Sequence, residues 1–183
     1  MTDFRAASLA NLRRLTTAPE TAGNAIAADA IWDISAPIGR LEGPDAIRGG
    51  LIEPLHSALS APIRRDEIFI GGRNIRAEGG QWVASVTHYV GNFIRPLFGL
   101  PPSGHLVFLR AGEFHRVDAD GRSRKARIIL DLVDLARQSG RMPLPESPGT
   151  EMLFPAPATH DGVLPGTGDG AVSLALVERM LSA

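Results

Sequence analysis

The sequence predicts an α+β fold in which helices cover one face of a curved antiparallel sheet. An amphipathic helix is expected near the N-terminus, where four side chains share one helical face: Phe4, Ser8, Leu12 and Leu15. Four β-rich runs follow later in the chain, separated by the turn signals "EGG", "GLPPSG" and "DADG". Helices first and consecutive strands afterwards are typical of an antiparallel sheet with helices on one face. A strongly curved sheet of this kind can hold a pocket between itself and the helices.

Composition excludes several classes of protein. The chain has 183 residues, about the length of one domain, and its 44% hydrophobic and 21% charged content is typical of a soluble globular protein. The net charge of -1, without a Lys/Arg run, argues against nucleic-acid and membrane partners. Cysteine is absent, which excludes disulfides and thiolate metal sites. Without a signal-peptide core or an apolar run of about 18 residues, a cytoplasmic location is expected.

The remaining elements follow from local signals. A second short helix is expected over residues 19–28, a strand over 30–35 and a loop over 36–44, where glycine and proline gather. A further helix is indicated by apolar residues at helical spacing, and three other residues are expected to weaken or kink it. The apolar positions are Ile47, Leu51, Leu55 and Leu59, and the interrupting residues are Gly49, Gly50 and Pro54. The expected later strands span residues 63–75, 81–93, 104–117 and 124–135.

The C-terminal part of the chain differs in character, which divides the sequence into a domain over residues 1–141 and a tail over residues 142–183. Six prolines and five glycines between residues 143 and 170 disfavour regular pairing. We expect residues 143–165 to be ordered but extended, with Phe154 buried against this domain or a dimer mate. Residues 171–181 are expected to form a short closing helix.

Ionisable side chains interrupt the apolar faces of the predicted strands. Strand alternation places Glu113 and His115 on the same face as a row of aliphatic residues. By the same alternation, His88 shares the apolar face of the strand over residues 81–93. Asp131 lies among isoleucines and leucines, where a carboxylate is costly to bury without a partner. Trp32, Trp82 and Tyr89 are expected to form core or pocket wall.

Structural roles account for each of these residues taken singly. His88 fits a hydrogen-bonded core histidine, Glu113 fits an ion pair with an arginine such as Arg127, and Asp131 fits a cap of the turn into "LVDLARQ". Their occurrence on neighbouring strands favours convergence on one cavity, where desolvation makes a near-neutral base available. We therefore predict that His88, His115 and Asp131 line one enclosed cavity. No phosphate loop, HExxH or GxSxG motif occurs, and the five histidines show no metal-ligand spacing, so neither cofactor nor metal is expected.

Two stretches, "THYVGNF…FGLPPSG" and "FHRVDADGRSRKARIILDLVDLARQSG", resemble the SnoaL-like polyketide cyclase family of the nuclear transport factor 2-like superfamily. The resemblance covers residues 10–140 approximately. It implies a cone-shaped, cystatin-like α+β fold with an internal cavity for a small apolar molecule, homodimers packed through the sheet, and aldol ring closure without a metal or cofactor. The family's acid/base aspartate falls on Asp131, and the histidine of its "THxG" stretch falls on His88.

The sequence departs from that family at three places. About four extra residues lie within "IRPLFG", Ser123 replaces an aliphatic residue, and Arg127 lies near the usual position of an aromatic one. The proline-rich tail also lies outside the pattern and resembles a connector to a second domain of this kind.

The primary functional hypothesis is an enzyme of cyclase or isomerase type. Asp131 would remove a proton alpha to a carbonyl, and His115 or His88 would stabilise the enolate. Glu113, Trp32, Trp82 and Tyr89 are the expected substrate-binding residues. The alternatives are a non-catalytic ligand-binding or dimerisation domain, and an epoxide-hydrolase-like enzyme in which an aspartate activates water.

Overall fold

A six-stranded curved sheet organises the domain in the computed structural model, which describes residues 4–74, 78–141, 145, 149 and 170–182. The strands lie in the order β2-β1-β6-β5-β4-β3. Their bounds are β1 Ile26–Ile34, β2 Gly39–Glu42, β3 Leu59–Arg73, β4 Gln81–Phe93, β5 Leu106–Val117 and β6 Ser123–Leu130. The expected α+β architecture with a curved sheet is therefore confirmed.

The sheet is mixed rather than wholly antiparallel. β1 runs parallel to β6, with Trp32 beside Ala126, whereas the other neighbouring strands pair antiparallel. The expectation of a purely antiparallel sheet is wrong at this one ladder. β1, the first strand of the chain, lies beside β6, the last one, and local sequence signals carry no information about a contact between strands so far apart in the sequence.

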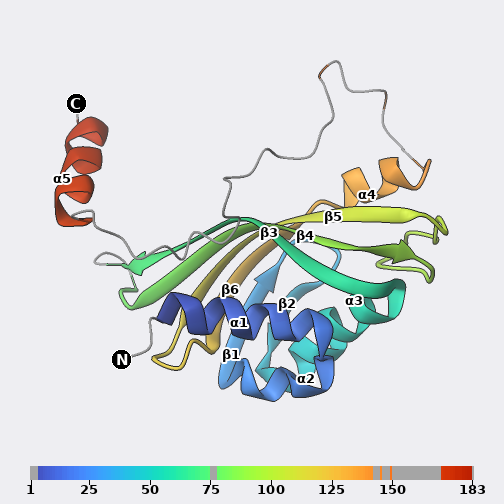
Figure 1. The fold of residues 1–183 in the computed structure, drawn as a ribbon, viewed down its shortest axis with the longest axis horizontal. Helices are drawn as coiled ribbons and strands as arrows, with labels where there is room; N and C mark the ends of the chain where they lie inside the picture. Colours follow the sequence, from blue (N-terminus) through green and yellow to red (C-terminus); the bar gives the residue numbers. More distant parts are fainter. Residues whose placement is uncertain (1–3, 75–77, 142–144, 146–148, 150–169, 183) are drawn as a thin grey trace.

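Helices cover the concave face of the sheet (Figure 1). Their bounds are α1 Phe4–Thr17, the 3₁₀ turn η1 Pro19–Asn24, α2 Gly43–Ile47, the π turn η2 Arg48–Ile52 and α3 Glu53–Ala58. α2, η2 and α3 follow one another without a break, and the expected distortion appears as the π turn at Gly49 and Gly50. The short helix expected over residues 19–28 is only the 3₁₀ turn, because β1 already begins at Ile26.

Two further elements differ from the sequence expectations. The expected loop over residues 36–44 contains the short strand β2, and the last expected strand ends early. After β6 the chain turns into α4 Leu132–Gln138, which packs on β5 on the opposite side of the sheet from α1–α3 (Figure 1). The closing helix is confirmed as α5 Gly170–Leu181. Phe154 and most of residues 143–165 lie outside the described residues.

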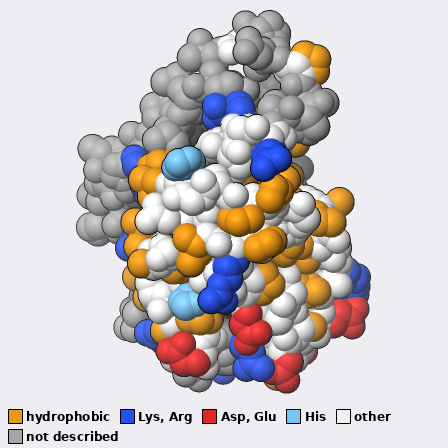
Figure 2. Space-filling model, turned by 90° about the vertical axis from the view of Figure 1, so that its right-hand side faces the viewer, with side chains coloured by type: hydrophobic (Ala, Val, Ile, Leu, Met, Phe, Trp, Pro, Cys, Tyr) orange, Lys and Arg blue, Asp and Glu red, His pale blue; other side chains and the backbone are white. Residues whose placement is uncertain are grey.

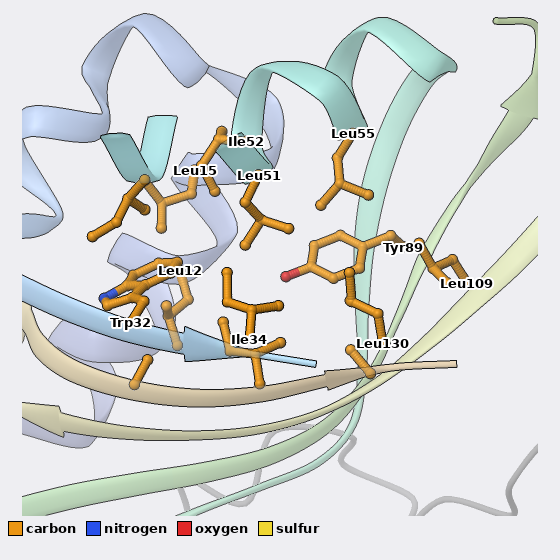
Figure 3. Packing of buried hydrophobic residues seen from close by; sticks show 14 of the residues in the cluster. Leu12, Leu15, Trp32, Ile34, Leu51, Ile52, Leu55, Tyr89, Leu109 and Leu130 are labelled. Carbon is orange, nitrogen blue, oxygen red and sulfur yellow. The ribbon is translucent and has the colours of Figure 1, made fainter. Parts of the chain in front are cut away.

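The hydrophobic core lies between the helical cover and the concave face of the sheet. Figure 3 shows leucine and isoleucine side chains from α1, η2 and α3 facing Trp32, Tyr89 and the aliphatic residues of the strands. Trp32 is 1% exposed, which places a large apolar side chain at the centre of this layer. In the part of the chain that the structure describes, no helix combines the length and apolarity needed to cross a bilayer.

The turn before β6 fixes the position of α1, which yields a stability prediction. Gly121 has φ +74°, and a Cβ there would lie 2.6 Å from the backbone nitrogen of Ser8 in α1. Gly140 has a similar φ of +66° but no atom within 4 Å of such a Cβ. Gly140→Ala should therefore cost only the left-handed strain, about 1–2 kcal/mol. Gly121→Ala should cost more, because α1 must also move. Urea unfolding of both variants measures the difference, and equal losses would contradict the contact.

Candidate active site

An enclosed cavity lies between the helical cover and the concave face of the sheet. Most of its lining is apolar, but one wall is polar and is formed by Arg64, Tyr89, Glu113 and His115. The apolar lining includes Leu12, Leu15, Trp32, Ile52, Leu55 and Ile128. The space that the centre of a water molecule can occupy is about 20 Å³. A cavity of this size holds one or two waters, so any larger ligand must displace side chains of the lining.

Strand register brings the polar side chains together. Arg64 of β3 lies opposite Tyr89 of β4, and Ser85 of β4 lies opposite Glu113 of β5. Directly paired residues point to the same face of a sheet, so all four side chains face the helical cover. His115, two residues beyond Glu113, faces the same way. The site is therefore held by three neighbouring strands rather than by loops.

Glu113 is the centre of the polar wall. Its two carboxylate oxygens accept hydrogen bonds from Nη1 of Arg64 at 3.0 and 2.9 Å. The Tyr89 hydroxyl donates to Oε1 at 2.6 Å, and Nε2 of His115 lies 3.2 Å from Oε2. The Ser85 hydroxyl lies 3.4 Å from Oε2. Because Glu113 is 1% exposed, these groups replace the water that a carboxylate would otherwise bind.

The network sets the protonation of its members. Burial alone would raise the pKa of Glu113, but the Arg64 charge and the hydrogen bonds from His115 and Tyr89 outweigh it and hold that pKa well below its usual range. Burial and the neighbouring Glu113 carboxylate raise the pKa of the Tyr89 hydroxyl. At neutral pH the wall therefore presents an ionised carboxylate and a neutral phenol. Glu113 is consequently a poor proton acceptor.

His115 is fixed on both ring nitrogens. Nε2 faces Glu113, and Nδ1 lies 3.0 Å from the hydroxyl oxygen of Ser123. The imidazole also meets the Trp32 ring edge-on, with 5.2 Å between ring centroids. With Nε2–H donated to the ionised Glu113, Nδ1 accepts from Ser123. A carboxylate behind an imidazole in this way stabilises the imidazolium that forms on proton uptake.

A second carboxylate extends the network to α1. Nε of Arg64 donates to Asp66 at 2.7 Å, and Nε of Arg13 in α1 donates to the other Asp66 oxygen at 2.9 Å. Arg64 thus lies between two buried carboxylates, and Arg13 supplies a further positive charge from the helical cover. The polar wall and α1 are therefore electrostatically coupled.

The cavity leads toward an external groove. His56, Leu59 and Pro62 line both the cavity and a surface groove, which also contains Ser57 and Arg95. Figure 2 is turned so that the α3 end faces the viewer, and it shows basic side chains (Lys or Arg) and histidine side chains among hydrophobic ones. The groove therefore adjoins the cavity at His56, Leu59 and Pro62. Its histidine, His56, is exposed and received no role from the sequence.

The structure brings four of the predicted site residues to the cavity. His115, Glu113, Trp32 and Tyr89 all line it. Figure 3 shows the Tyr89 hydroxyl pointing into the space between helices and sheet. The indole Nε1 of Trp32 is buried and has no hydrogen-bond partner among the described residues. The expected partner of Glu113, Arg127, lies opposite Phe114 and so faces away; Arg64 pairs with Glu113 instead.

His88 lies on the other face of the sheet, so the prediction of one cavity shared with His115 is wrong. His88 lies opposite Arg110 in the β4–β5 pairing and directly precedes Tyr89 in the strand. Its side chain therefore points to the opposite face from those of Tyr89 and Glu113. Its Nδ1 lies 3.1 Å from the buried carboxylate of Glu67, and its ring meets Phe108 edge-on. β4 is buried on both faces at this point, so apolar alternation could not tell which side faces the helices. Trp82 shares the outer face, half-buried in a surface groove.

Asp131 also lies outside the cavity. It precedes α4 as its N-cap, where its carboxylate accepts from the backbone N–H of Asp134 at 2.9 Å and from Arg110 at 2.7 Å. The side chain is 31% exposed, and neighbouring Ile129 is 67% exposed, so the expected dry surroundings are absent. Asp131 therefore has the structural role that the sequence also suggested, as a cap of the turn into α4.

Sequence reasoning missed Arg64 and Asp66, and it had a usable signal for them. The stretch "IRRDE" places four consecutive charged residues directly after Ile63 in a strand. Such a run usually marks a solvated edge, but here ordinary strand alternation turns Asp66 to the face of Arg64, and it turns Glu67 to the opposite face, beside His88. Among the described residues, no group of three or more acidic or histidine side chains is placed to hold a metal ion.

Comparison with solved structures places this architecture among known folds. The candidate polyketide cyclase IdmH from Streptomyces antibioticus is 19% identical, covering 74% of this chain and 98% of its own, with a TM-score of 0.59. A SnoaL-like polyketide cyclase from Agrobacterium tumefaciens is 17% identical, covering 75% and 98%, with a TM-score of 0.57. A protein of ketosteroid isomerase-like fold from Catenulispora acidiphila, solved with trimethylamine, is 18% identical, covering 76% and 95%, with a TM-score of 0.55.

These likenesses establish the fold. The chain has the cone fold shared by SnoaL-like polyketide cyclases and ketosteroid isomerase-like proteins, and the resemblance read from its sequence is confirmed at that level. By sequence, no protein-family model matches the chain and no curated protein is significantly similar to it.

Removal of Arg64 tests how far the fold depends on the polar wall. Arg64→Leu would leave Glu113 and Asp66 buried without their shared cation, which typically costs about 3–5 kcal/mol. Urea unfolding of the variant should show a loss of this size. The control is Arg40→Leu, which breaks an exposed ion pair with Glu42 and should shift the midpoint little. Comparable shifts in the two variants would contradict a structural role for the Arg64 pair.

The outer histidine predicts a pH dependence of stability. Burial lowers the pKa of His88, and the charges of Arg110 and Arg65 lower it further, although the Glu67 carboxylate opposes them. The unfolded chain, with an ordinary histidine pKa of about 6.5, therefore binds more protons, so stability falls as the pH drops below that value. His88→Gln should flatten the melting-temperature profile between about pH 7.5 and 5. An unchanged profile would contradict this assignment. The contribution of the ionised Glu113 to stability can be separated from that of His88, because it is lost only below about pH 4.3.

Proposed function

We propose that this chain, which has the SnoaL-like cyclase fold, is a cofactor-independent acid/base enzyme that cyclises or isomerises a small apolar carbonyl compound. The observation that carries the proposal is the hydrogen-bonded chain of Tyr89, Glu113 and His115 in the wall of an enclosed apolar cavity. Titratable groups that converge on a dry cavity are the usual apparatus of proton transfer. The position of the cavity supports the proposal, because it lies where three rigid strands fix every polar group.

In this proposal His115 is the acid/base residue, in place of Asp131. Histidine is the side chain whose ordinary pKa lies near neutrality. Glu113 is held ionised by Arg64, so it serves to stabilise the imidazolium of His115 rather than to accept the substrate proton. The proton taken from the carbon alpha to the carbonyl resides on His115 and returns from it to the product. Because Nε2–H stays bonded to Glu113, a substrate must displace the Ser123 hydroxyl to reach the accepting ring nitrogen, Nδ1.

Two donors are available for the substrate carbonyl. Trp32 contributes a buried indole N–H without a partner among the described residues, and a ligand oxygen would satisfy it. The Tyr89 hydroxyl can turn from Glu113 toward a developing enolate, as the negative charge on the enolate oxygen grows. The apolar lining selects for a substrate with an apolar body. A mouth between His56, Leu59 and Pro62 provides the route inward.

A second candidate function is non-catalytic binding of a small molecule. It is favoured by the saturation of the polar wall, since both carboxylate oxygens of Glu113 and both nitrogens of His115 already have partners. A network of this kind can stabilise the sheet and shape a pocket without taking part in any chemical step. The homodimer expected from the family resemblance stays a prediction, and exposed Ile70, Phe114 and Ile129 on the outer face are surface that it would bury.

Turnover by single-site variants tests the enzymatic proposal. His115→Gln and Tyr89→Phe, assayed against β-keto esters and anthraquinone-type polyketides, should each lose activity. The loss of an acid/base residue typically costs on the order of 100- to 10,000-fold in rate. Tyr89→Phe should lose less, since it removes one hydroxyl and no proton carrier. Circular dichroism confirms that each variant is folded.

Asp131→Asn discriminates between the two possible bases. Asparagine keeps the helix cap, so the variant should fold normally. Full turnover by Asp131→Asn together with loss in His115→Gln supports the cavity site. The reverse result would return the base to Asp131. An absence of turnover by the unaltered protein across the panel, with ligand binding retained, would favour the binding function.

A further inference from the structure

The C-terminal helix repeats the residue pattern of the N-terminal helix. Residues 6–17, "AASLANLRRLTT", align without gaps on residues 171–182, "AVSLALVERMLS". Five of the twelve positions are identical: Ala6 and Ala171, Ser8 and Ser173, Leu9 and Leu174, Ala10 and Ala175, Arg14 and Arg179. Of the other seven positions, three exchange one apolar residue for another: Ala7 and Val172, Leu12 and Val177, Leu15 and Met180. The two helices are thus two versions of one amphipathic pattern.

The repeat preserves the face that α1 buries. α1 buries five side chains in the domain: Ser8, Leu9, Leu12, Leu15 and Thr16. Their counterparts in α5 are Ser173, Leu174, Val177, Met180 and Leu181. In α5 this face is exposed: Val177 is 50% exposed and Leu181 83%, and no residue of the helix is buried. Figure 1 shows α1 beneath the concave face of the sheet and α5 apart from the sheet.

An exposed apolar face on a short helix is usually stabilised by packing against a partner. Isolated helices shorter than about 12–15 residues are marginal in water, and most helical stability comes from packing an apolar face. α5 has 12 residues and an apolar stripe formed by residues 174, 177, 180 and 181. Because the same stripe in α1 packs on the concave face of a cone, the shape that α5 fits is a concave face of the same kind.

Two differences exclude this chain's own concave face as the match. At the position of Arg13, which donates to the buried Asp66, α5 has Glu178, so that two carboxylates would meet. At the position of Ala7, which the Gly121 turn approaches closely, α5 has the larger Val172. A second copy of this chain has the same two obstacles. The partner therefore differs from this domain at both places.

We infer that α5 is the first helix of a second, non-identical cone unit and packs on the concave sheet face of that unit as α1 packs here. The unit has a basic or uncharged side chain in place of Asp66 and more room opposite residue 172. It is identified by shape and charge alone, and the inference does not depend on the proposed enzymatic function.

Exchange of the distinguishing residues within the full chain tests this inference. Arg13→Glu gives α1 the charge of α5 and should lower the thermal midpoint, on the order of a few degrees. Adding Val172→Ala and Glu178→Arg gives α5 the pattern of α1 and should recover at least half of that loss. The same two changes without Arg13→Glu provide the reference midpoint against which this recovery is measured. The control adds Ala175→Arg to Arg13→Glu instead, since the equivalent Ala10 is exposed in α1, and should recover nothing.

A disulfide reports where α5 lies in the recovered variant. Gly71 is in contact with Arg5 of α1, and the counterpart of Arg5 in the repeat is Gly170. The chain has no cysteine, so Gly71→Cys and Gly170→Cys introduce a unique pair. Cross-linking within or between chains places α5 on the concave face. No cross-link, no recovery, recovery by the Ala175 control, or an unchanged midpoint in Arg13→Glu would each overturn the inference.

Discussion

The buried guanidinium of Arg64 is the interaction on which the rest of this structure depends. It bonds Glu113 on one side and Asp66 on the other, and Asp66 in turn accepts from Arg13 of α1. β3, β5 and the first helix are thereby joined through charges that cannot be left unpaired in an apolar interior, and the neutral Tyr89 of β4 bonds both Arg64 and Glu113. The same requirement fixes the rotamers that form the cavity wall. Site geometry and fold stability are therefore consequences of one electrostatic constraint.

Sequence periodicity predicted the elements that depend on local contacts. α1, the distorted α2–η2–α3 segment, β4, β5 and α5 follow from amphipathic spacing, glycine and proline positions, and alternation. The elements that were missed depend on distant partners. β2 is a strand because it pairs with β1, and the parallel ladder of β1 with β6 joins the beginning and the end of the domain. α4 was missed because its apolar residues also fit an extension of β6.

The candidate site shows the same division. On β5, one face is aliphatic apart from Glu113 and His115, so alternation identified the inward side correctly. On β4, Val90 and His88 are buried on one face and Val83 and Tyr89 on the other, so no pattern within the strand identifies the cavity side. The neighbouring strand decides it, through the pairing of Ser85 with Glu113. Alternation within one strand thus predicts which of its side chains share a face. The pairing with the neighbouring strand then decides whether that face is the one toward the helices.

The saturation of the polar wall limits where this protein can change shape. A ligand can bond to Tyr89 or His115 only by replacing a bond inside the network, and it needs more room than the closed cavity offers. The strands cannot supply that room without separating Arg64 from its carboxylates. The helical cover lines the cavity near the mouth with the apolar side chains of Ile52 and Leu55 and with His56, and its π turn at Gly49 and Gly50 already departs from regular helix geometry. Opening therefore requires movement of the α2–η2–α3 cover, while the sheet keeps the chemistry in place.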